Sequence, residues 1–163
     1  MYSDGTGVTK LTTEEDWHYG PPKWSPDKTK IAFTARESGS VNLIYVMNRD
    51  GSGVTQITND SHPKGFKPDW SPDNSQIIWK GTSTSPPLED TIYAINSDGS
   101  GNLQSIYTHA QGFLNSPDWC PNGDKIAFEA TGTQSNNRSI FIVNTDGTNL
   151  IELTVNSPGN YNV

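Results

Sequence analysis

The sequence is poor in cysteine, in positive charge and in long hydrophobic runs. Its 163 residues include one Cys, which excludes an internal disulfide framework and a cluster of thiolate metal ligands. Lys and Arg number 11 against 18 Asp and Glu, so the formal net charge is −7. No nucleic-acid partner is therefore expected, and docking on anionic membranes is disfavoured, because both bind clustered cations. No apolar run approaches the roughly 18 residues of a membrane span, so no membrane insertion is expected.

Hydrophobic residues are also sparse. They make up 31% of the chain, a level that is compatible with disorder. Five Trp, six Tyr and five Phe indicate a packed core instead, because each aromatic side chain buries a large area. No segment keeps the 3.6-residue periodicity of an amphipathic helix, so essentially no helix is predicted.

One sequence pattern occurs three times. In each copy a Trp precedes a turn containing Pro, an Ile follows the Trp by seven positions, and an aromatic residue lies two positions further on. The copies are PPKWSPDKTKIAF (21–33), KPDWSPDNSQIIW (67–79) and SPDWCPNGDKIAF (116–128). Their Trp residues, Trp24, Trp70 and Trp119, lie 46 and 49 residues apart. Self-similarity at such a period is the signature of a repeat fold.

A second motif keeps the same phase. Its copies are LIYVMNRDGSG (43–53), TIYAINSDGSG (91–101) and SIFIVNTDGTN (139–149), with YSDGTG (2–7) as a partial fourth. The stretches before the Asp-Gly are rich in β-branched and aromatic residues, as strands prefer. The Asp-Gly itself suits a tight hairpin turn; its Asp residues are Asp4, Asp50, Asp98 and Asp146. Each repeat thus predicts four antiparallel strands, a to d, which is the size and content of a β-propeller blade.

The repeats indicate a single all-β domain, half of a propeller, over residues 1–163. The first part, residues 1–12, contains an orphan outer strand d at about 7–12. The blades are expected at 13–58, 59–107 and 108–154, with a C-terminal tail at 155–163.

Together the two motifs resemble the repeat of TolB-like β-propellers, over about residues 2 to 154. The resemblance implies that Trp24, Trp70 and Trp119 pack between blades, and that Asp50, Asp98 and Asp146 lie in the hairpins between strands c and d. It implies that strand a lines a central channel. It also implies presentation of loops and a channel mouth to protein or peptide partners, and a periplasmic or secreted location.

The resemblance implies six blades, whereas the chain encodes three. Open blade faces would expose Trp and Ile, which soluble monomers avoid. Two copies are therefore expected to pair as a homodimer that closes a six-blade ring. The alternative is that the chain is a fragment of a larger propeller.

Three histidines, His18, His62 and His109, precede the repeat Trp residues and are expected in the d-to-a connections near the channel mouth. Three His near one axis suit a transition metal, and lyases with related propellers use such clusters. Their unequal offsets of 6, 8 and 10 residues from the Trp favour ordinary surface loops. The Asp-Gly turns lack the Glu that completes a Ca²⁺ loop. No metal is assigned.

Two further groups are candidate ligand-binding residues. Lys23, Asp69 and Asp118 directly precede the repeat Trp residues, so they are expected near the channel, either as a site or as solvated, mutually paired charges. Trp17 and Tyr19 flank His18 in a segment that lies outside the repeat. This segment is expected to be a loop that binds sugar or peptide, or a plug over the first blade.

No nucleophile elbow, zinc motif or P-loop occurs, and Cys120 simply occupies the position of Ser25 and Ser71. No catalytic residue and no cofactor are assigned. The sequence favours a non-catalytic binding module for a protein, peptide or carbohydrate partner. The alternative is a metal-dependent carbohydrate-active enzyme, a lyase or hydrolase, that uses the three histidines.

Overall fold

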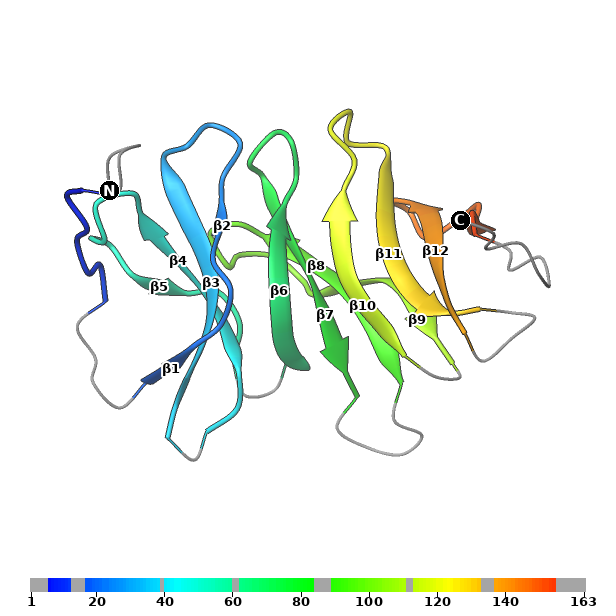
Figure 1. Ribbon diagram of the computed structural model, residues 1–163, viewed down its shortest axis with the longest axis horizontal. Coiled ribbons are helices and arrows are strands. Elements are labelled where there is room, and N and C mark those ends of the chain that lie inside the picture. Colours follow the sequence, from blue (N-terminus) through cyan, green and yellow to red (C-terminus); the bar gives the residue numbers. More distant parts are fainter. Residues whose placement is uncertain are drawn as a thin grey trace.

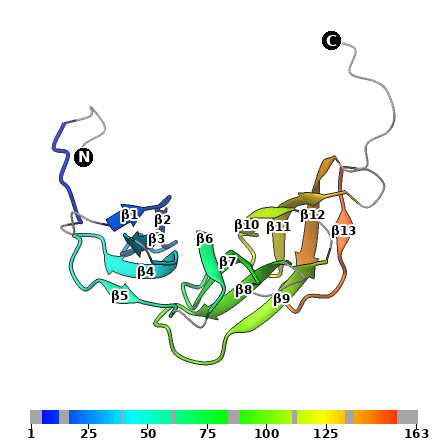
Figure 2. The same ribbon diagram turned by 90° about the horizontal axis from the view of Figure 1, so that it is seen from below.

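The computed structural model describes residues 6–12, 17–38, 40–59, 62–83, 89–110, 113–132 and 137–154. Within these ranges the chain forms strands and no helix, which confirms the all-β prediction. The described part accordingly contains no helix that is long and apolar enough to cross a membrane. Three antiparallel sheets stand side by side in chain order (Figure 1). They fan out in an arc whose concave side is formed by the first strands of the sheets (Figure 2).

Each sheet is one blade, and its strands follow one another in sequence order. Blade 1 contains β1 (Trp17–Tyr19), β2 (Lys23–Trp24), β3 (Lys30–Glu37), β4 (Leu43–Asn48) and β5 (Thr55–Gln56). Blade 2 contains β6 (Lys64–Trp70), β7 (Gln76–Thr82), β8 (Asp90–Asn96) and β9 (Gln104–His109). Blade 3 contains β10 (Leu114–Trp119), β11 (Lys125–Thr131), β12 (Arg138–Asn144) and β13 (Ile151–Glu152).

The hairpins between the third and fourth strands form as the Asp-Gly motif predicts. In the first of them the Asp50 carboxylate accepts the backbone N–H of Ser52 at 2.9 Å, and Gly51 takes a φ of 88° that favours glycine. The same N–H to carboxylate bond recurs at Asp98 and Asp146, at 2.8 and 2.9 Å. These three Asp side chains are therefore engaged by their own turns, and Asp4 lies outside the described residues.

The innermost strands of blades 2 and 3 bend at one position, three residues before the repeat Trp. Lys67 in β6 and Ser116 in β10 have φ values of 51° and 50° there, and the pairing register shifts across both positions. Blade 1 has Pro21 at this position. Because proline fixes φ near −65°, blade 1 cannot repeat the bend, and its inner strand is split into β1 and β2. Both halves pair with β3.

The prediction that Trp17–Tyr19 lies in a loop outside the repeat is wrong. The segment is β1, with His18 opposite Arg36 and Tyr19 opposite Ala35. It is the first half of the inner strand of blade 1. The aromatic side chains pack on this blade, since the Trp17 and Tyr45 ring centroids lie 5.1 Å apart.

Apolar clusters fill the two seams between blades. Trp70 packs with Ala32, Ile44 and Val46 of blade 1, and Trp119 packs with Ile78, Ile92 and Ala94 of blade 2. These two Trp residues are 3% and 8% exposed, which confirms their packing between blades. Trp24 is 52% exposed, so the prediction is wrong for this residue. The reason is that no blade precedes blade 1 in the described structure.

Residues 6–12 form no strand, contrary to the expected orphan strand d. The strands a to c that would pair with them are not encoded in this sequence. Leu11 nevertheless packs against the cluster of Ile31, Phe33 and Tyr45 on the outward face of blade 1. Trp17 joins it there. We call Leu11 and Trp17 the N-terminal cover.

Candidate functional site

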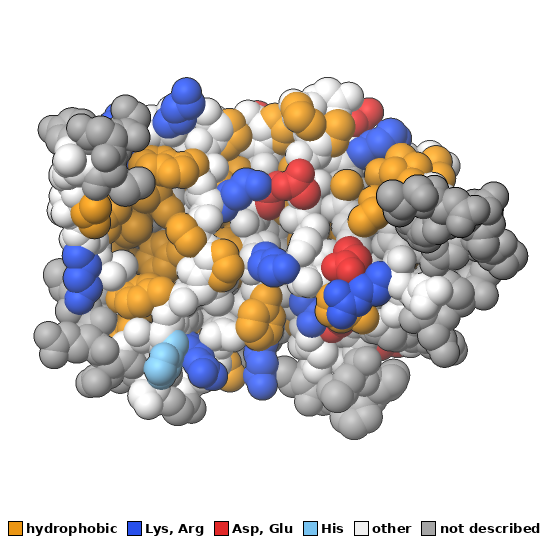
Figure 3. Space-filling model, in the orientation of Figure 1, with side chains coloured by type: hydrophobic (Ala, Val, Ile, Leu, Met, Phe, Trp, Pro, Cys, Tyr) orange, Lys and Arg blue, Asp and Glu red, His pale blue; other side chains and the backbone are white. Residues whose placement is uncertain are grey.

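The concave face formed by the inner strands is a candidate binding surface. Figure 3 shows this face, with positive and negative side chains along its middle and hydrophobic side chains on both sides of them. Two hollows lie at opposite ends of the inner strands. One includes the turns that follow the repeat Trp residues, and the other includes the starts of the strands.

The hollow at the turns contains a three-residue charge cluster. Lys23 Nζ lies 3.1 Å from Asp69 Oδ1 and 3.1 Å from Asp118 Oδ1, so one residue from each blade takes part. The other oxygen of Asp69 accepts the backbone N–H of Trp119 at 2.6 Å. The Trp70 indole donates to the Lys23 carbonyl at 3.1 Å. The structure thus brings the three predicted residues together and uses them to join the inner ends of the blades.

The pKa of Lys23 reflects this cluster. Partial burial by itself would lower the pKa, but the hydrogen bonds and attraction of Asp69 and Asp118 outweigh it, and the pKa is raised above its usual value. Lys23 is therefore protonated at neutral pH. Both carboxylates contact this one ammonium group. This arrangement fits the alternative in which the three residues are mutually paired charges.

The hollow at the strand starts is a groove that crosses all three blades, with a volume of about 580 Å³. We call it the inner groove. Tyr19 and Phe66, which line it, are 38% and 40% exposed. Its positively charged lining residues are Arg36, Lys67 and Lys80, and none of the described residues that line it is Asp or Glu. The groove is thus basic and aromatic, although the chain is acidic overall.

The cations of the inner groove differ in how they are neutralised. Lys80 forms an ion pair with Asp90 at 2.8 Å. Burial would raise the pKa of Asp90, but the hydrogen bonds from Lys80 and Thr82 and the charge of Lys80 lower it. Lys67 Nζ donates to the neutral Ser116 hydroxyl at 2.7 Å. Arg36 is exposed and forms no ion pair with any described residue. Among the described residues, Arg36 and Lys67 therefore have no carboxylate partner.

The three histidines do not come together. His18 lies in β1 and lines the inner groove, whereas His62 lies in the connection between β5 and β6. His109 ends β9, where its ring lies 3.4 Å from the Tyr107 hydroxyl. The prediction that all three lie in d-to-a connections therefore holds for His62 alone. No group of three or more His, Cys, Asp or Glu among the described residues is arranged to hold a metal ion.

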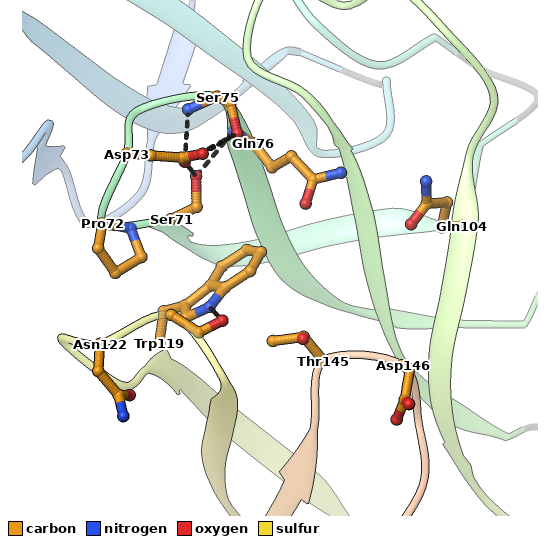
Figure 4. Close-up of a pocket in the computed structure, with 11 residues that line it drawn as sticks. Ser71, Pro72, Asp73, Ser75, Gln76, Gln104, Trp119, Asn122, Thr145 and Asp146 are labelled. Atoms are coloured by element: carbon orange, nitrogen blue, oxygen red, sulfur yellow. Dashed lines mark hydrogen bonds between the residues drawn. The ribbon is translucent and has the colours of Figure 1, made fainter.

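A third hollow, of about 560 Å³, lies in the seam between blades 2 and 3 (Figure 4). Its carboxylates, Asp73 and Asp146, belong to turns. The Ser71 hydroxyl and the Ser75 N–H and hydroxyl lower the pKa of Asp73 to about 2. Hydrogen bonds from Thr148 lower the pKa of Asp146. Because these carboxylates are already engaged, the hollow is a feature of blade packing.

Arg36, Phe66 and Lys67 were not among the residues predicted from the sequence. The predicted inner-strand residues directly precede the repeat Trp, whereas Phe66 and Lys67 lie four and three positions before Trp70. The available signal was the inner strand itself, because every residue on it is a candidate for the concave face. Arg36 carried no such signal, since it lies at the far end of the second strand.

Comparison with known proteins gives a consistent fold. The family model described as TolB beta propeller domain matches residues 4–157. A TolB-type protein of Agrobacterium tumefaciens is 25% identical, with a TM-score of 0.68 over 82% of this chain and 45% of that one. TolB of Acinetobacter baumannii is 23% identical, with a TM-score of 0.68 over 88% and 34%. An oligogalacturonate lyase of Vibrio parahaemolyticus is 17% identical, with a TM-score of 0.70 over 91% and 43%.

The chain spans less than half the length of each of these three structures. The similarity to the Acinetobacter and Vibrio proteins, below 25% identity, concerns the fold alone. No match was found among curated proteins.

Proposed function

Because the chain belongs to the TolB β-propeller family, we propose that it is a non-catalytic binding module whose inner groove takes a protein, peptide or carbohydrate ligand. The observation that supports this function is the lining of the groove. Exposed aromatic side chains lie beside Arg36 and Lys67, with no carboxylate among the described lining residues. Aromatic and Arg side chains are the usual anchors of binding surfaces.

The charges select the chemistry of the ligand. Arg36 offers a planar fork of donors that fits a carboxylate, and Lys67 offers a point charge within the same groove. Tyr19 and Phe66 provide apolar contact beside them. The ligand is therefore an acidic segment of a protein or peptide, in which carboxylates alternate with groups that pack on the rings. An acidic oligosaccharide is the second class to be tested.

Calorimetric titration tests this function. The probes are a hexaglutamate peptide, its hexaglutamine counterpart and a galacturonate oligomer. We expect hexaglutamate to bind, hexaglutamine not to bind, and Arg36→Gln with Lys67→Gln to reduce the affinity at least tenfold. Lys10→Gln is the control, because it removes one charge from an exposed residue outside the groove. Equal affinity for both peptides, or equal loss in the control, would contradict the proposal, and binding of the galacturonate alone would reassign the ligand class.

We further propose that two copies form a homodimer that completes the propeller. Trp24 and Ile140, at opposite ends of the arc, are 52% and 43% exposed, and their burial favours association. Light scattering coupled to size exclusion tests this state against the chain mass of 17.8 kDa. A mass twice that value supports the dimer. A mass of 17.8 kDa at all concentrations contradicts it and favours a fragment of a larger propeller.

The enzyme alternative receives no support from the site. A metal-dependent lyase or hydrolase would need the three histidines near one another, and they lie in β1, in the β5–β6 connection and at the end of β9. The likeness to the Vibrio lyase, at 17% identity, concerns the fold. We therefore assign no catalytic residue and no cofactor.

A further inference from the structure

Among the described residues, nothing packs on the face of blade 3 that corresponds to the face on which each of the other two blades receives its neighbour. The receiving positions are Ala32, Ile44 and Val46 in blade 1 and Ile78, Ile92 and Ala94 in blade 2. By strand pairing, the equivalent positions in blade 3 are Ala127, Ile140 and Ile142. Ile44 and Ile92 are fully buried, whereas Ile140 is 43% exposed. We call Ala127, Ile140 and Ile142 the blade 3 face.

Blade 1 carries the matching half of such a seam. In each formed seam the repeat Trp of the later blade packs on the receiving face of the earlier one. Trp24 is the third of these Trp residues, and it has no face to pack on among the described residues. A hollow of about 480 Å³ lies beside it, lined by Ser25, Pro26, Lys28 and Arg49 as well as Trp24 itself. One chain therefore carries both halves of a third seam, at opposite ends of its arc (Figure 2).

The charge cluster repeats the same asymmetry. Asp69, on blade 2, accepts the backbone N–H of Trp119 on blade 3. Asp118 occupies the equivalent position on blade 3, directly before Trp119, and its side chain is 67% exposed. It contacts Lys23 and accepts no N–H from a following blade in the described structure. Asp69 accepts the backbone N–H of the repeat Trp on the next blade. By the same rule, Asp118 would accept the backbone N–H of Trp24 from a second copy.

We propose that two copies of this chain dock head to tail through two identical seams, each formed by Trp24 of one copy on the blade 3 face of the other, with the Asp118 carboxylate accepting the Trp24 N–H. The inference rests on the proposed homodimer and specifies its geometry. A seam of this kind pairs two different surfaces, and two such seams close a two-fold ring. A Trp24-to-Trp24 dimer would leave the blade 3 face uncovered.

Docking also requires Leu11 of the N-terminal cover to move, whereas Trp17 stays in β1. In the seam between blades 2 and 3, the turn at Gly147 packs on Ile106 near the outer edge of blade 2. In the seam between blades 1 and 2, the turn at Gly99 packs on Ile57. The Gly51 turn packs on Leu11 in the same way. Leu11 thus lies where the outer strand of a preceding blade lies. In the docked ring, β13 of the other copy takes that place.

Two single variants and their mixture test the docking. Trp24→Glu and Ile140→Glu place a charge on opposite halves of the seam, at exposed positions where substitutions leave folding intact. Each variant alone disrupts both seams of a head-to-tail ring, so each is expected to have the mass of one chain. In a mixed dimer, the unaltered Trp24 of the Ile140→Glu variant meets the unaltered Ile140 of the Trp24→Glu variant. One of the two seams is therefore intact in an equimolar mixture. The mixture is therefore expected to regain the mass of two chains.

The control and the contradicting results are distinct. Ser105→Glu alters an exposed residue of β9 in the middle blade, away from Trp24 and the blade 3 face, and it is expected to stay dimeric. Circular dichroism confirms that each variant is folded. A dimer that survives Ile140→Glu but not Trp24→Glu, or a mixture that stays monomeric, overturns the docking and leaves the homodimer standing. An unaltered chain that is monomeric throughout overturns both.

Discussion

The Asp69 carboxylate accepts the backbone N–H of Trp119 at 2.6 Å, across the seam between blades 2 and 3. Its other oxygen contacts the Lys23 ammonium group at 3.1 Å. A single buried side chain thereby connects the inner strands of all three blades. The residue before the repeat Trp is acidic in blades 2 and 3 and is Lys23 in blade 1. The three blades therefore contribute different groups to this connection.

Asp69→Ala is expected to destabilise the fold. It leaves the Trp119 N–H without its acceptor and removes a partner of Lys23, which costs about 1–3 kcal/mol. Asp118→Ala is the matched control, because Asp118 also contacts Lys23 at 3.1 Å but is largely exposed, and it is expected to cost less than about 1 kcal/mol. Urea unfolding in the Ile140→Glu background measures both without association. Equal losses for the two variants would show that the N–H bond contributes nothing.

Acid is expected to weaken the fold through Asp73. Its pKa is lowered from 3.8 to about 2 in the folded chain, so its hydrogen bonds stabilise the fold above pH 3.8 and are lost as the pH falls toward 2. Asp73→Asn removes this titration. Asn fits the turn, because Asn122 occupies the equivalent position and accepts from Cys120 Sγ at 2.6 Å. The free energy of unfolding should fall less between pH 5 and pH 2 in the variant; an identical fall would rule out this role for Asp73.

A glycine pair tests the packing of the turns against the preceding blade. Gly147 and Gly123 have φ values of 81° and 84°, so alanine strains both by roughly 1–2 kcal/mol. A side chain at Gly147 would also overlap the Ile106 carbonyl, whereas at Gly123 the nearest atom lies 3.9 Å away. Gly147→Ala is therefore expected to lower the thermal unfolding midpoint more than Gly123→Ala does. Equal midpoints would mean that the contact with Ile106 is loose.

The repeat predicted the blades because each blade depends on short local signals, namely a Trp, a β-branched strand and an Asp-Gly turn. It missed β1 because Pro21 and Pro22 interrupt the inner strand, and local pattern cannot show that Trp17–Tyr19 still pairs with β3. It misplaced His109 because the fourth strands differ in length, from Thr55–Gln56 in blade 1 to Gln104–His109 in blade 2. The inner groove depends on residues of three blades, which meet only in the folded chain.

The N-terminal cover leads to a prediction about association. Leu11 lies where the outer strand of another copy would pack, so Leu11→Ser is expected to lower the dissociation constant of the dimer several-fold while weakening the monomer. Val8→Ser is the control, because Val8 is 75% exposed in the same segment. Sedimentation equilibrium measures the dissociation constant of the dimer for each of the two variants. Weaker association in Leu11→Ser would mean that the segment supports the dimer.

Amide chemical shifts report where on the molecule a ligand binds, and therefore test whether the inner groove is the binding surface. The ¹H–¹⁵N spectrum of the labelled chain is recorded while hexaglutamate is added, with hexaglutamine as the matched titration. We expect the largest shifts on backbone amides of the groove, namely Tyr19, Gly20, Phe66, Lys67 and Asn115, and no shift of these amides with hexaglutamine. Shifts confined to the hollow of Ser71, Asp73 and Asp146, or no shifts at all, would contradict it.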